Sequence, residues 1–417
     1  MIHAVKGTRD ILPPSSDLWN AVEQRGREVF HAFNYHEIRT PIFEETLLFA
    51  RGVGEETDIV TKEMYTFEDR DGASLTLRPE CTASVIRAHI EHRLDQQPGL
   101  LKLFYMGPMF RRERPQKGRF RQFYQIGAEA IGSDSPAVDS EVIELAVEIL
   151  SRAGLQEFRL LVNSVGCSEC RPKFMASLRV ELRKVVSSLC SDCRRRVETN
   201  PLRVLDCKVE ADQAAIDKLP SILDHLCGNC QVHFDSVRHY LQDRGIGFEV
   251  RPRLVRGLDY YTRTTFEITH GALGAQNSVV GGGRYDGLAE ALGSKVRSPG
   301  IGFSIGEDRL IMSLEEAATG PREAGLDVFM APIGEPALLR SAALARELRR
   351  LGKSVELGLD GKLKRSLELA NKLGARYALI VGETEIAAGN YQLKDMATGE
   401  QQTVTQSELF ERLGLKL

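Results

Sequence analysis

The chain has no long apolar run and no strong excess of either charge. No stretch of its 417 residues approaches the roughly 18 consecutive apolar residues of a membrane-spanning helix, so we expect no membrane association. Residues 1–10 have neither the apolar core nor the small-residue cleavage site of a signal peptide, and a cytoplasmic protein is the expectation. The net charge of −3 argues against a strongly basic nucleic-acid-binding protein but leaves room for local basic patches.

Internal repeats and low-complexity tracts are also missing, which excludes repeat architectures. The glycine-rich residues 281–284 lack the Gly-Lys-Ser/Thr of a P-loop. Hydrophobic and charged residues make up 42% and 27% of the chain, which is ordinary for a globular protein. The length predicts two to three domains.

Residues 1–160 and 245–315 alternate helix-like and strand-like segments. Apolar spacing predicts helices over residues 17–33, 82–91 and 139–153, and strands over residues 64–67, 74–77, 101–106, 121–129 and 261–268. Residues 316–325 have the composition of a linker. Beyond it, strands are predicted over residues 327–333, 355–359, 377–381, 387–396 and 402–405, with helices over 338–351 and 363–373. Apolar strands separated by amphipathic helices favour parallel pairing with helical cover.

Cysteine is concentrated in one region, residues 165–250, which is otherwise helical in pattern and partly basic. Seven of the eight cysteines fall there, and six of them form three Cys-x-x-Cys pairs: Cys167/Cys170, Cys190/Cys193 and Cys227/Cys230. The 19 residues between the first two pairs fit a four-thiolate zinc site. Alternatively, the thiols are small buried hydrophobes on a helical insertion. The basic run could face RNA phosphates or be a solvated helix face.

Residues 256–267 combine an arginine, a glycine, an aspartate and a tyrosine pair with a β-branched run. Read as a strand, this segment would place Asp259 and Tyr261 on one face. Arg256 and Tyr261 held on a rigid sheet would suit a small anionic or polar ligand. The alternative is an ordinary tyrosine-rich strand with a solvent-facing arginine.

Two further segments contain residues suited to binding a ligand. Residues 110–121 hold six cationic side chains in twelve positions between two predicted strands, and guanidinium groups match phosphate oxygens. Glu113 in this loop could accept a hydrogen bond from an exocyclic amine such as that of adenine. Residues 298–310 read as a strand running into a helix, where small residues at 302, 304 and 306 would leave one face open to a flat ligand. Arg309 stands at the helix start, where an anion is favoured.

These segments resemble the signature motifs of class II aminoacyl-tRNA synthetases. Residues 37–41 are similar to motif 1, the basic loop to motif 2, and residues 302–309 to motif 3. Residues 256–267, together with residues 77–82, resemble the histidine-specific members, the bacterial histidyl-tRNA synthetases. The resemblance covers essentially the whole chain.

The resemblance implies an α+β fold. A catalytic domain over residues 1–320 would contain an antiparallel sheet flanked by helices, interrupted by the mostly helical insertion at 165–250. Residues 326–417 would form an α/β anticodon-binding domain. The implied function is ATP-dependent ligation of L-histidine to tRNA(His) through a histidyl-adenylate, by a homodimer with the motif 1 proline, Pro41, at its interface. ATP would act as its Mg²⁺ complex.

Residue roles follow from the same resemblance. The histidine-binding residues would be Glu80, Thr82, Gln125, Glu129, Tyr260 and Tyr261, with Glu129 and Tyr261 bracketing the imidazole. The ATP-binding residues would be Arg111, Glu113 and Arg309; Arg111 and Arg256 would stabilise the α-phosphate during catalysis. Arg114 and Gln116 would reach the tRNA acceptor end.

This chain departs from the family pattern at three positions, and other functions stay open. Asp308 stands where motif 3 commonly has Glu, Ser304 where Gly or Ala is usual, and Cys81 where glycine is frequent. A metal or ribose contact at Asp308 is therefore in doubt. A non-catalytic, histidine-sensing regulator that partners ATP phosphoribosyltransferase is one alternative; that paralogue generally lacks an anticodon-binding domain. Prolyl- or threonyl-specific enzymes are another.

Overall fold

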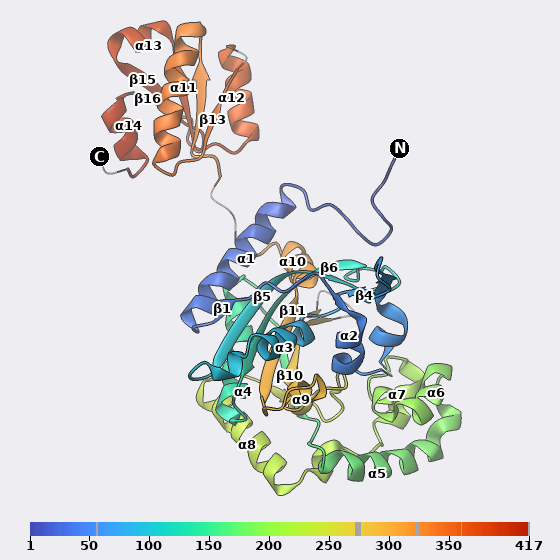
Figure 1. The fold of residues 1–417 in the computed structure, drawn as a ribbon. Helices are drawn as coiled ribbons and strands as arrows, with labels where there is room; N and C mark the ends of the chain where they lie inside the picture. The colour runs from blue at the N-terminus through green and yellow to red at the C-terminus, as the bar shows by residue number, and fades with distance from the viewer. Residues whose placement is uncertain (56, 272–276, 322–324, 360, 416–417) are drawn as a thin grey trace. The chain divides into compact units, whose positions relative to one another are not determined.

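The computed structural model describes residues 1–55, 57–271, 277–321, 325–359 and 361–415. It separates into two compact units, Met1–Pro321 and Arg322–Leu417 (Figure 1). Residues 322–324, inside the predicted linker, lie outside the described residues. Within the described residues, no helix has both the length and the apolar character needed to cross a membrane.

The first unit is built on a large sheet with strand order β1-β5-β6-β11-β10-β9-β7-β8. These strands are β1 (His36–Glu37), β5 (Leu101–Phe110), β6 (Gln122–Ile131), β7 (Arg159–Ser164), β8 (Glu249–Val250), β9 (Thr262–Thr269), β10 (Ser278–Arg284) and β11 (Gly300–Gly306). Neighbours pair antiparallel throughout, except for the parallel pairs β1–β5 and β7–β8 at the two edges. The predicted antiparallel sheet is thus confirmed.

Helices surround this sheet, and a smaller sheet lies beside it. The helices are α1 (Ser15–Ala32), α2 (Thr46–Val53), α3 (Thr82–Glu91), α4 (Pro136–Arg152), α5 (Cys170–Val185), α6 (Ser191–Thr199), α7 (Glu210–Ile216), α8 (Gly228–Asp243), α9 (Leu288–Ala291) and α10 (Glu307–Glu316). Shorter helical turns cover Ile59–Glu63, Leu94–Gln96, Val186–Ser188, Pro201–Val204 and Ile222–His225. The small sheet has the order β2 (Phe43–Glu45), β4 (Ser74–Leu77) and β3 (Tyr65–Glu68).

The two faces of the large sheet differ because side chains alternate along each strand. On β6, Ile126, Ala128 and Ala130 enter the main apolar core, which also contains side chains of α1, α4, α8 and α10. On β11, the corresponding residues are Ile301, Phe303 and Ile305. Between them, Gln125, Gly127 and Glu129 of β6 and Gly302 and Ser304 of β11 face the other way. Helices α3 and α9 cover part of that face, and the part that they leave open is available for a site.

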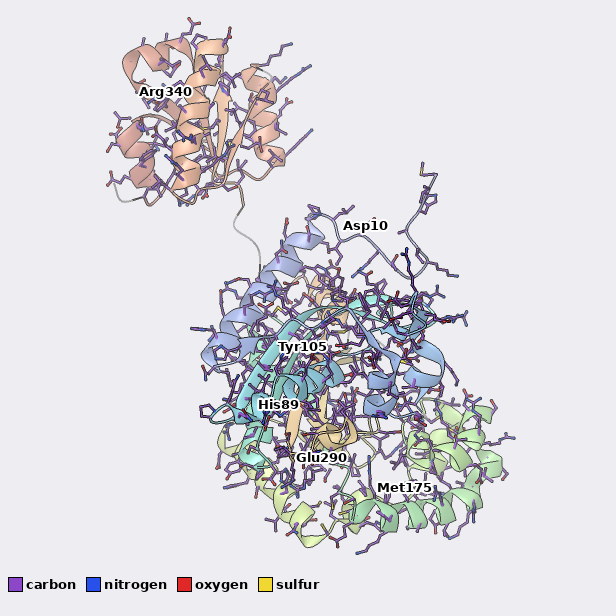
Figure 2. The ribbon with its side chains drawn as sticks, in the orientation of Figure 1. Asp10, His89, Tyr105, Met175, Glu290 and Arg340 are labelled. Atoms are coloured by element: carbon purple, nitrogen blue, oxygen red, sulfur yellow. The ribbon has the colours of Figure 1, made fainter. Side chains whose placement is uncertain are left out.

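The cysteine-rich region is mostly helical, as predicted. Helices α5, α6 and α7 have an apolar core of their own and extend away from the large sheet (Figures 1 and 2, where Met175 marks α5). Helix α8 is not part of this separate core, because Phe234, Val237 and Leu241 pack into the main core with α4. The separately packed part therefore ends before α8.

The second unit contains a mixed sheet of order β13-β12-β14-β15-β16. Its elements are β12 (Val328–Pro332), α11 (Glu335–Arg350), β13 (Val355–Leu357), α12 (Leu363–Lys372), β14 (Tyr377–Val381), α13 (Glu383–Ala388), β15 (Asn390–Asp395), β16 (Gln401–Thr405) and α14 (Gln406–Arg412). Parallel pairing holds for β12, β13 and β14, but β15 and β16 pair antiparallel. The predicted parallel pairing therefore holds for the three strands that α11 and α12 separate, whereas β15 pairs antiparallel with both β14 and β16.

A buried ionic network ties the sheet of the first unit to its helical layer. Arg284, at the end of β10, is fully buried and pairs with Asp139 of α4 and with Asp286. Asp139 also accepts a hydrogen bond from His233 of α8 over 2.8 Å. A buried charge is tolerated only when it is paired and hydrogen-bonded, so these partners depend on one another.

Asp139→Asn is expected to destabilise the first unit by about 3–5 kcal/mol, because it leaves the Arg284 guanidinium buried without its main counter-charge. Urea unfolding followed by tryptophan fluorescence measures this, since the single tryptophan, Trp19, is buried in that unit. Arg152→Gln is the control: it breaks the exposed Arg152–Glu148 pair and should cost no more than about 0.5 kcal/mol. Equal unfolding midpoints for the two variants would contradict the role of the network.

Candidate active site

A single cavity on the open face of the large sheet gathers most of the residues that the sequence singled out. The ones that line it are Glu80, Thr82, Arg111, Glu113, Gln125, Arg256, Tyr260, Tyr261 and Arg309. They come from five places in the chain: the start of α3, the β5–β6 hairpin, β6 itself, the turn before β9, and α10. Residues up to 229 positions apart in the sequence thus share one site.

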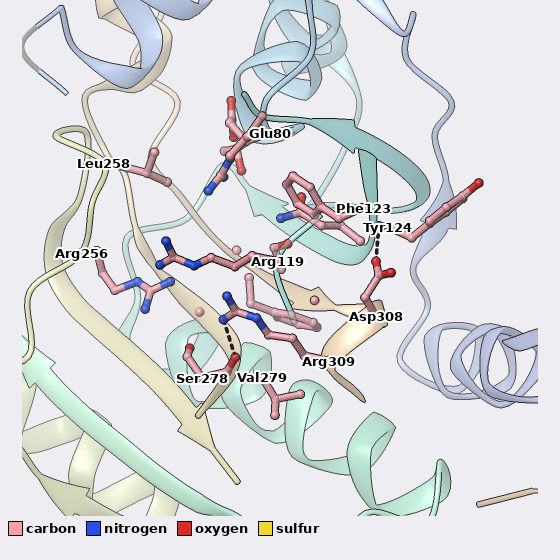
Figure 3. A pocket seen from close by; sticks show the side chains of 18 of the residues that line it. Glu80, Arg119, Phe123, Tyr124, Arg256, Leu258, Ser278, Val279, Asp308 and Arg309 are labelled. Atoms are coloured by element: carbon pink, nitrogen blue, oxygen red, sulfur yellow. Dashed lines mark hydrogen bonds between the residues drawn. The ribbon is translucent and has the colours of Figure 1, made fainter. Parts of the chain in front are cut away.

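Guanidinium groups dominate one part of the cavity. Figure 3 shows Arg119, Arg256 and Arg309 pointing into the same central space. Arg309 is held by the carbonyl oxygens of Gly118 and Ser278, at 3.0 and 2.9 Å from its Nε and Nη1 atoms. Burial and the neighbouring Arg119 lower the pKa of Arg309, which reflects a positive potential that an anionic ligand would relieve.

Arg111 and Arg256 are positioned by the surrounding backbone and by carboxylates. The Nε of Arg111 donates to the Pro79 carbonyl over 2.9 Å. Arg256 pairs with Glu267 of β9 at 3.3 Å, and its buried Nε has no protein partner among the described residues. Both guanidinium groups are therefore oriented while retaining donors for a ligand.

Carboxylates occupy another part of the site, beginning with Glu80. The carboxylate oxygens of Glu80 accept hydrogen bonds from the backbone N–H groups of Thr82 and Ala83 at 2.8 and 2.9 Å. The first N–H groups of a helix lack acceptors within the helix, so Glu80 fixes the start of α3 while facing the cavity. Burial raises the pKa of Glu80, and these two N–H groups oppose the rise.

Glu129 lies directly behind the cavity wall. Its side chain is fully buried and accepts hydrogen bonds from the hydroxyls of Thr82 and Tyr285, both of which line the cavity, at 2.7 and 2.6 Å. Burial raises the pKa of Glu129 to about 8. A buried carboxyl group with a pKa raised this far is a candidate for a functional role.

Glycine provides the space for two of these side chains. A Cβ atom on Gly302 would collide with the Glu129 carboxylate, and one on Gly281 would collide with the Arg256 guanidinium. The glycine run that does not form a P-loop has a different role: it lets large polar side chains lie flat against the strands.

Two of the departures from the family pattern have structural explanations. The Asp308 carboxylate accepts hydrogen bonds from Arg9 and from the backbone N–H of Tyr124, at 2.9 and 2.7 Å, so it ties the N-terminal segment to β6. With both oxygens engaged, Asp308 serves as a structural anchor. Cys81 is fully buried, lies 3.4 Å from the Thr40 hydroxyl and packs behind the lining residues Tyr105 and Tyr285 without lining the cavity itself.

Other predicted site residues lie outside the cavity or in a different conformation. Arg114 and Gln116 are exposed on the β5–β6 hairpin and do not line the cavity. Strand β9 begins only at Thr262, so Asp259 and Tyr261 lie in the preceding turn. The expectation that they share one face of a strand is wrong, although Tyr260 and Tyr261 both line the cavity.

Sequence reasoning missed Tyr285, Tyr105 and Arg119 as lining residues. Tyr285 follows the glycine-rich strand directly, and that position was the available signal. Tyr105 packs over Gly127 of the adjacent strand, and its role depends on strand pairing that the sequence alone does not reveal.

The cysteines pair differently from the prediction. Cys167 and Cys170 meet Cys227 and Cys230, while Cys190 and Cys193 meet Cys207 and Asp212. The prediction of one four-thiolate site formed by Cys167/Cys170 and Cys190/Cys193 is therefore wrong. The chain folds back so that the third pair, distant in sequence, reaches the first.

Comparison with known proteins agrees with this geometry. The family model described as "Histidyl-tRNA synthetase" matches residues 7–310, and that described as "Anticodon binding domain" matches residues 327–414. "Histidine--tRNA ligase" of Solibacter usitatus is 69% identical over 414 residues, covering 99% of both chains. The protein of the same name from Koribacter versatilis is 55% identical, over 98% of this chain and 95% of that protein.

A solved structure shows the same architecture. Apo histidyl-tRNA synthetase of S. aureus superposes with a TM-score of 0.81 at 38% identity, covering 99% of both chains. These matches extend over nearly the whole length of the chain and agree with a cavity that brings carboxylates and arginines together, and the chain belongs to the histidyl-tRNA synthetase family.

Proposed function

We propose that this protein is a histidine–tRNA ligase that activates L-histidine with ATP and transfers it to tRNA(His), releasing AMP and pyrophosphate. The observation that carries the proposal is the single cavity in which buried carboxylates and convergent arginines meet. An amino acid joined to a nucleotide phosphate needs both. The site of action proposed is the cytoplasm, where tRNA is charged.

Histidine would bind at the carboxylate part of the cavity. Glu80, Thr82 and Gln125 would hold the α-amino group, and the buried Gln125 Oε1 has no protein partner among the described residues. Glu129 and Tyr261 would face the two imidazole nitrogens, with Tyr260 beside them. A pocket with polar partners for both nitrogens rejects side chains that lack them, because its own groups would stay unpaired.

ATP, as its Mg²⁺ complex, would bind at the arginine part. Arg111 and Arg256 would contact the α-phosphate, Glu113 the adenine amine and Arg309 the γ-phosphate. When the histidine carboxylate attacks the α-phosphate, negative charge accumulates on its oxygens. Fixed guanidinium groups in a site shielded from water stabilise that charge, and no protein base is needed because the attacking carboxylate is already ionised.

The tRNA would contact residues outside the cavity, some in the first unit and some in the second. Arg114 and Gln116 are exposed on the hairpin beside the cavity and could contact the acceptor end. In the second unit, Lys362, Lys364 and Arg365 lie at the start of α12, where they suit RNA phosphates. The presence of the second unit and of Arg111, Arg256 and Arg309 argues against the regulatory alternative.

A homodimer is proposed from an exposed apolar surface around the motif 1 segment. Ile42, Phe43, Leu47 and Phe67 are 45%, 54%, 49% and 45% exposed, and they lie next to Pro41 on the small sheet and the start of α2. Large apolar side chains that gather on one surface mark a protein interface. A second copy of the chain is the proposed partner.

The function is tested by ATP–pyrophosphate exchange with each amino acid in the absence of tRNA. We expect exchange with histidine alone. Arg256→Gln should lower kcat by about 10²–10³, because one donor to the developing charge is lost. Arg251→Gln removes an arginine from the same segment outside the cavity and should leave kcat unchanged. Histidine binding without exchange would refute the enzymatic function.

Histidine affinity should be highest between about pH 6.5 and 8. The free imidazole of histidine carries a proton below about pH 6.5, and the Glu129 carboxyl carries one below about pH 8. If the bound imidazole and Glu129 share one proton, binding must release a proton below about pH 6.5, where both groups are protonated, and take one up above about pH 8, where neither is. Affinity therefore falls on both sides of this range. Calorimetric titration across this range measures the effect. In Glu129→Gln, the fall in histidine affinity above about pH 8 that comes from the carboxyl group should disappear, while any fall that comes from the α-amino group of histidine should stay. If the wild type and the variant lose affinity in the same way above about pH 8, the shared proton is contradicted.

Phe43→Asp should convert the dimer to monomers, because it places a charge in the proposed apolar interface. Sedimentation velocity distinguishes the two states. Val232→Asp, at a 67% exposed position of α8 away from this surface, should leave the dimer intact. A monomeric wild-type chain, or a dimeric Phe43→Asp variant, would reject this interface.

A further inference from the structure

Two groups of metal-ligating side chains lie in and beside the helical insert and are not part of the active-site cavity lining. All eight cysteines lie in the described part of the chain, and all are free thiols. Seven of them fall into two clusters in which one ligand atom of each residue lies within 4.8 Å of the others. We propose that each cluster binds one zinc ion: a first site formed by Cys167, Cys170, Cys227 and Cys230, and a second formed by Cys190, Cys193, Cys207 and Asp212.

The first cluster has the dimensions of a four-thiolate site. The Sγ atoms of Cys167 and Cys170 are 3.6 Å apart, and those of Cys167 and Cys227 are 3.9 Å apart. Four sulfurs arranged tetrahedrally about 2.3 Å from a zinc ion are separated by about 3.8 Å. The observed separations are far too long for a disulfide and match a metal-centred arrangement.

The backbone around the first cluster is shaped for thiolates. The N–H of Cys227 donates to the Cys170 Sγ over 3.1 Å, a hydrogen bond that stabilises negative charge on sulfur. Gly166 has a φ of +67°, and a Cβ there would collide with the Cys170 side chain. Two Cys-x-x-Cys turns face each other, one leading into α5 and the other into α8.

The second cluster contains a buried carboxylate. Asp212 is 1% exposed and accepts hydrogen bonds from the Cys190 N–H at 3.0 and 3.1 Å. It lies 3.3 Å from the Cys207 Sγ. No lysine or arginine of the described residues forms an ion pair with it. A buried carboxylate beside three thiols is stabilised most directly by a bound cation.

The composition of both clusters favours zinc. Thiolates in a tetrahedral arrangement select zinc or iron–sulfur chemistry, while hard cations such as Mg²⁺ prefer oxygen. An aspartate completing three cysteines is compatible with zinc, which accepts carboxylate oxygen. Four protein ligands in each cluster leave no open position, so these sites are structural.

The location of the clusters explains what such ions would do. The first cluster joins the two ends of the insert, 60 residues apart in sequence, and the second lies within its small apolar core, which includes Cys193 and Cys207. Cores of this size commonly need a metal or a cross-link to hold their fold. Zinc would therefore fix both the shape of the insert and its attachment.

The insert in turn supports the segment that carries Arg256. Val255 packs in the core of the insert, Arg171 of α5 donates to the Asp259 carbonyl over 3.4 Å, and a Cβ on Gly257 would collide with Arg203. Loss of zinc would loosen these contacts and misplace the Arg256 guanidinium. This consequence, unlike the metal sites themselves, depends on the proposed function.

Elemental analysis of the full chain, purified in reducing buffer without chelator, tests the sites. We expect two zinc ions per chain, one in Cys167→Ser/Cys227→Ser, one in Cys190→Ser/Asp212→Asn, and two in Cys81→Ser, which changes the cysteine outside the clusters. Less than one zinc per wild-type chain, or iron in its place, would overturn the proposal. A wild-type chain that binds only one zinc and keeps it in Cys190→Ser/Asp212→Asn would overturn the second site, and the same result with Cys167→Ser/Cys227→Ser would overturn the first.

X-ray absorption of the wild-type protein keeps the test decisive if a variant does not fold. Zinc should be surrounded mainly by sulfur at about 2.3 Å, with a minority of oxygen from Asp212. A shell made mostly of nitrogen and oxygen would overturn both sites.

Removal of zinc should lower kcat of pyrophosphate exchange more than it changes the KM for histidine, and added zinc should restore it. An unchanged kcat in zinc-free protein would overturn the positioning role alone.

Discussion

The structure of the first unit depends on strict alternation along β6 and β11. Ile126, Ala128 and Ala130 must face the helical layer, and this places Gln125, Gly127 and Glu129 on the opposite face. A shift in register by one residue would turn the polar set into the apolar core and the apolar set toward the cavity face. The same alternation therefore determines both which side chains form the hydrophobic core and which form the floor of the cavity.

This constraint produces a site in which opposite charges meet. Glu80 and the guanidinium groups of Arg111, Arg256 and Arg309 line one cavity, and the buried carboxylate of Glu129 lies behind its wall. Under the proposed function, the α-amino group of histidine would contact the carboxylates of the site and the phosphates of ATP would contact its arginines. Such an arrangement would orient the two substrates before any bond forms, which lowers the entropic part of the barrier.

Much of this architecture could be predicted from the sequence. Helix α3 and strand β14 have the predicted bounds, because their apolar pattern and flanking residues agree with each other. Helix α13 is not predicted from the sequence, and the predicted strand over residues 387–396 includes its last two residues, because the helix is short and only Gly389 separates it from β15. The start of β9 was placed too early, because aromatic residues in a turn have the same composition as a strand.

By itself, the sequence determined the local elements, the motifs and the family resemblance, because these depend on residues close together in the chain. Tertiary structure alone decided which residues meet. Tyr285 reaches Glu129 across 156 positions, and Cys167 meets Cys227 rather than Cys190. Contacts of this kind arise when the strands pair and α8 packs against α4, and a spacing rule that counts residues along the chain contains no information about that pairing and packing.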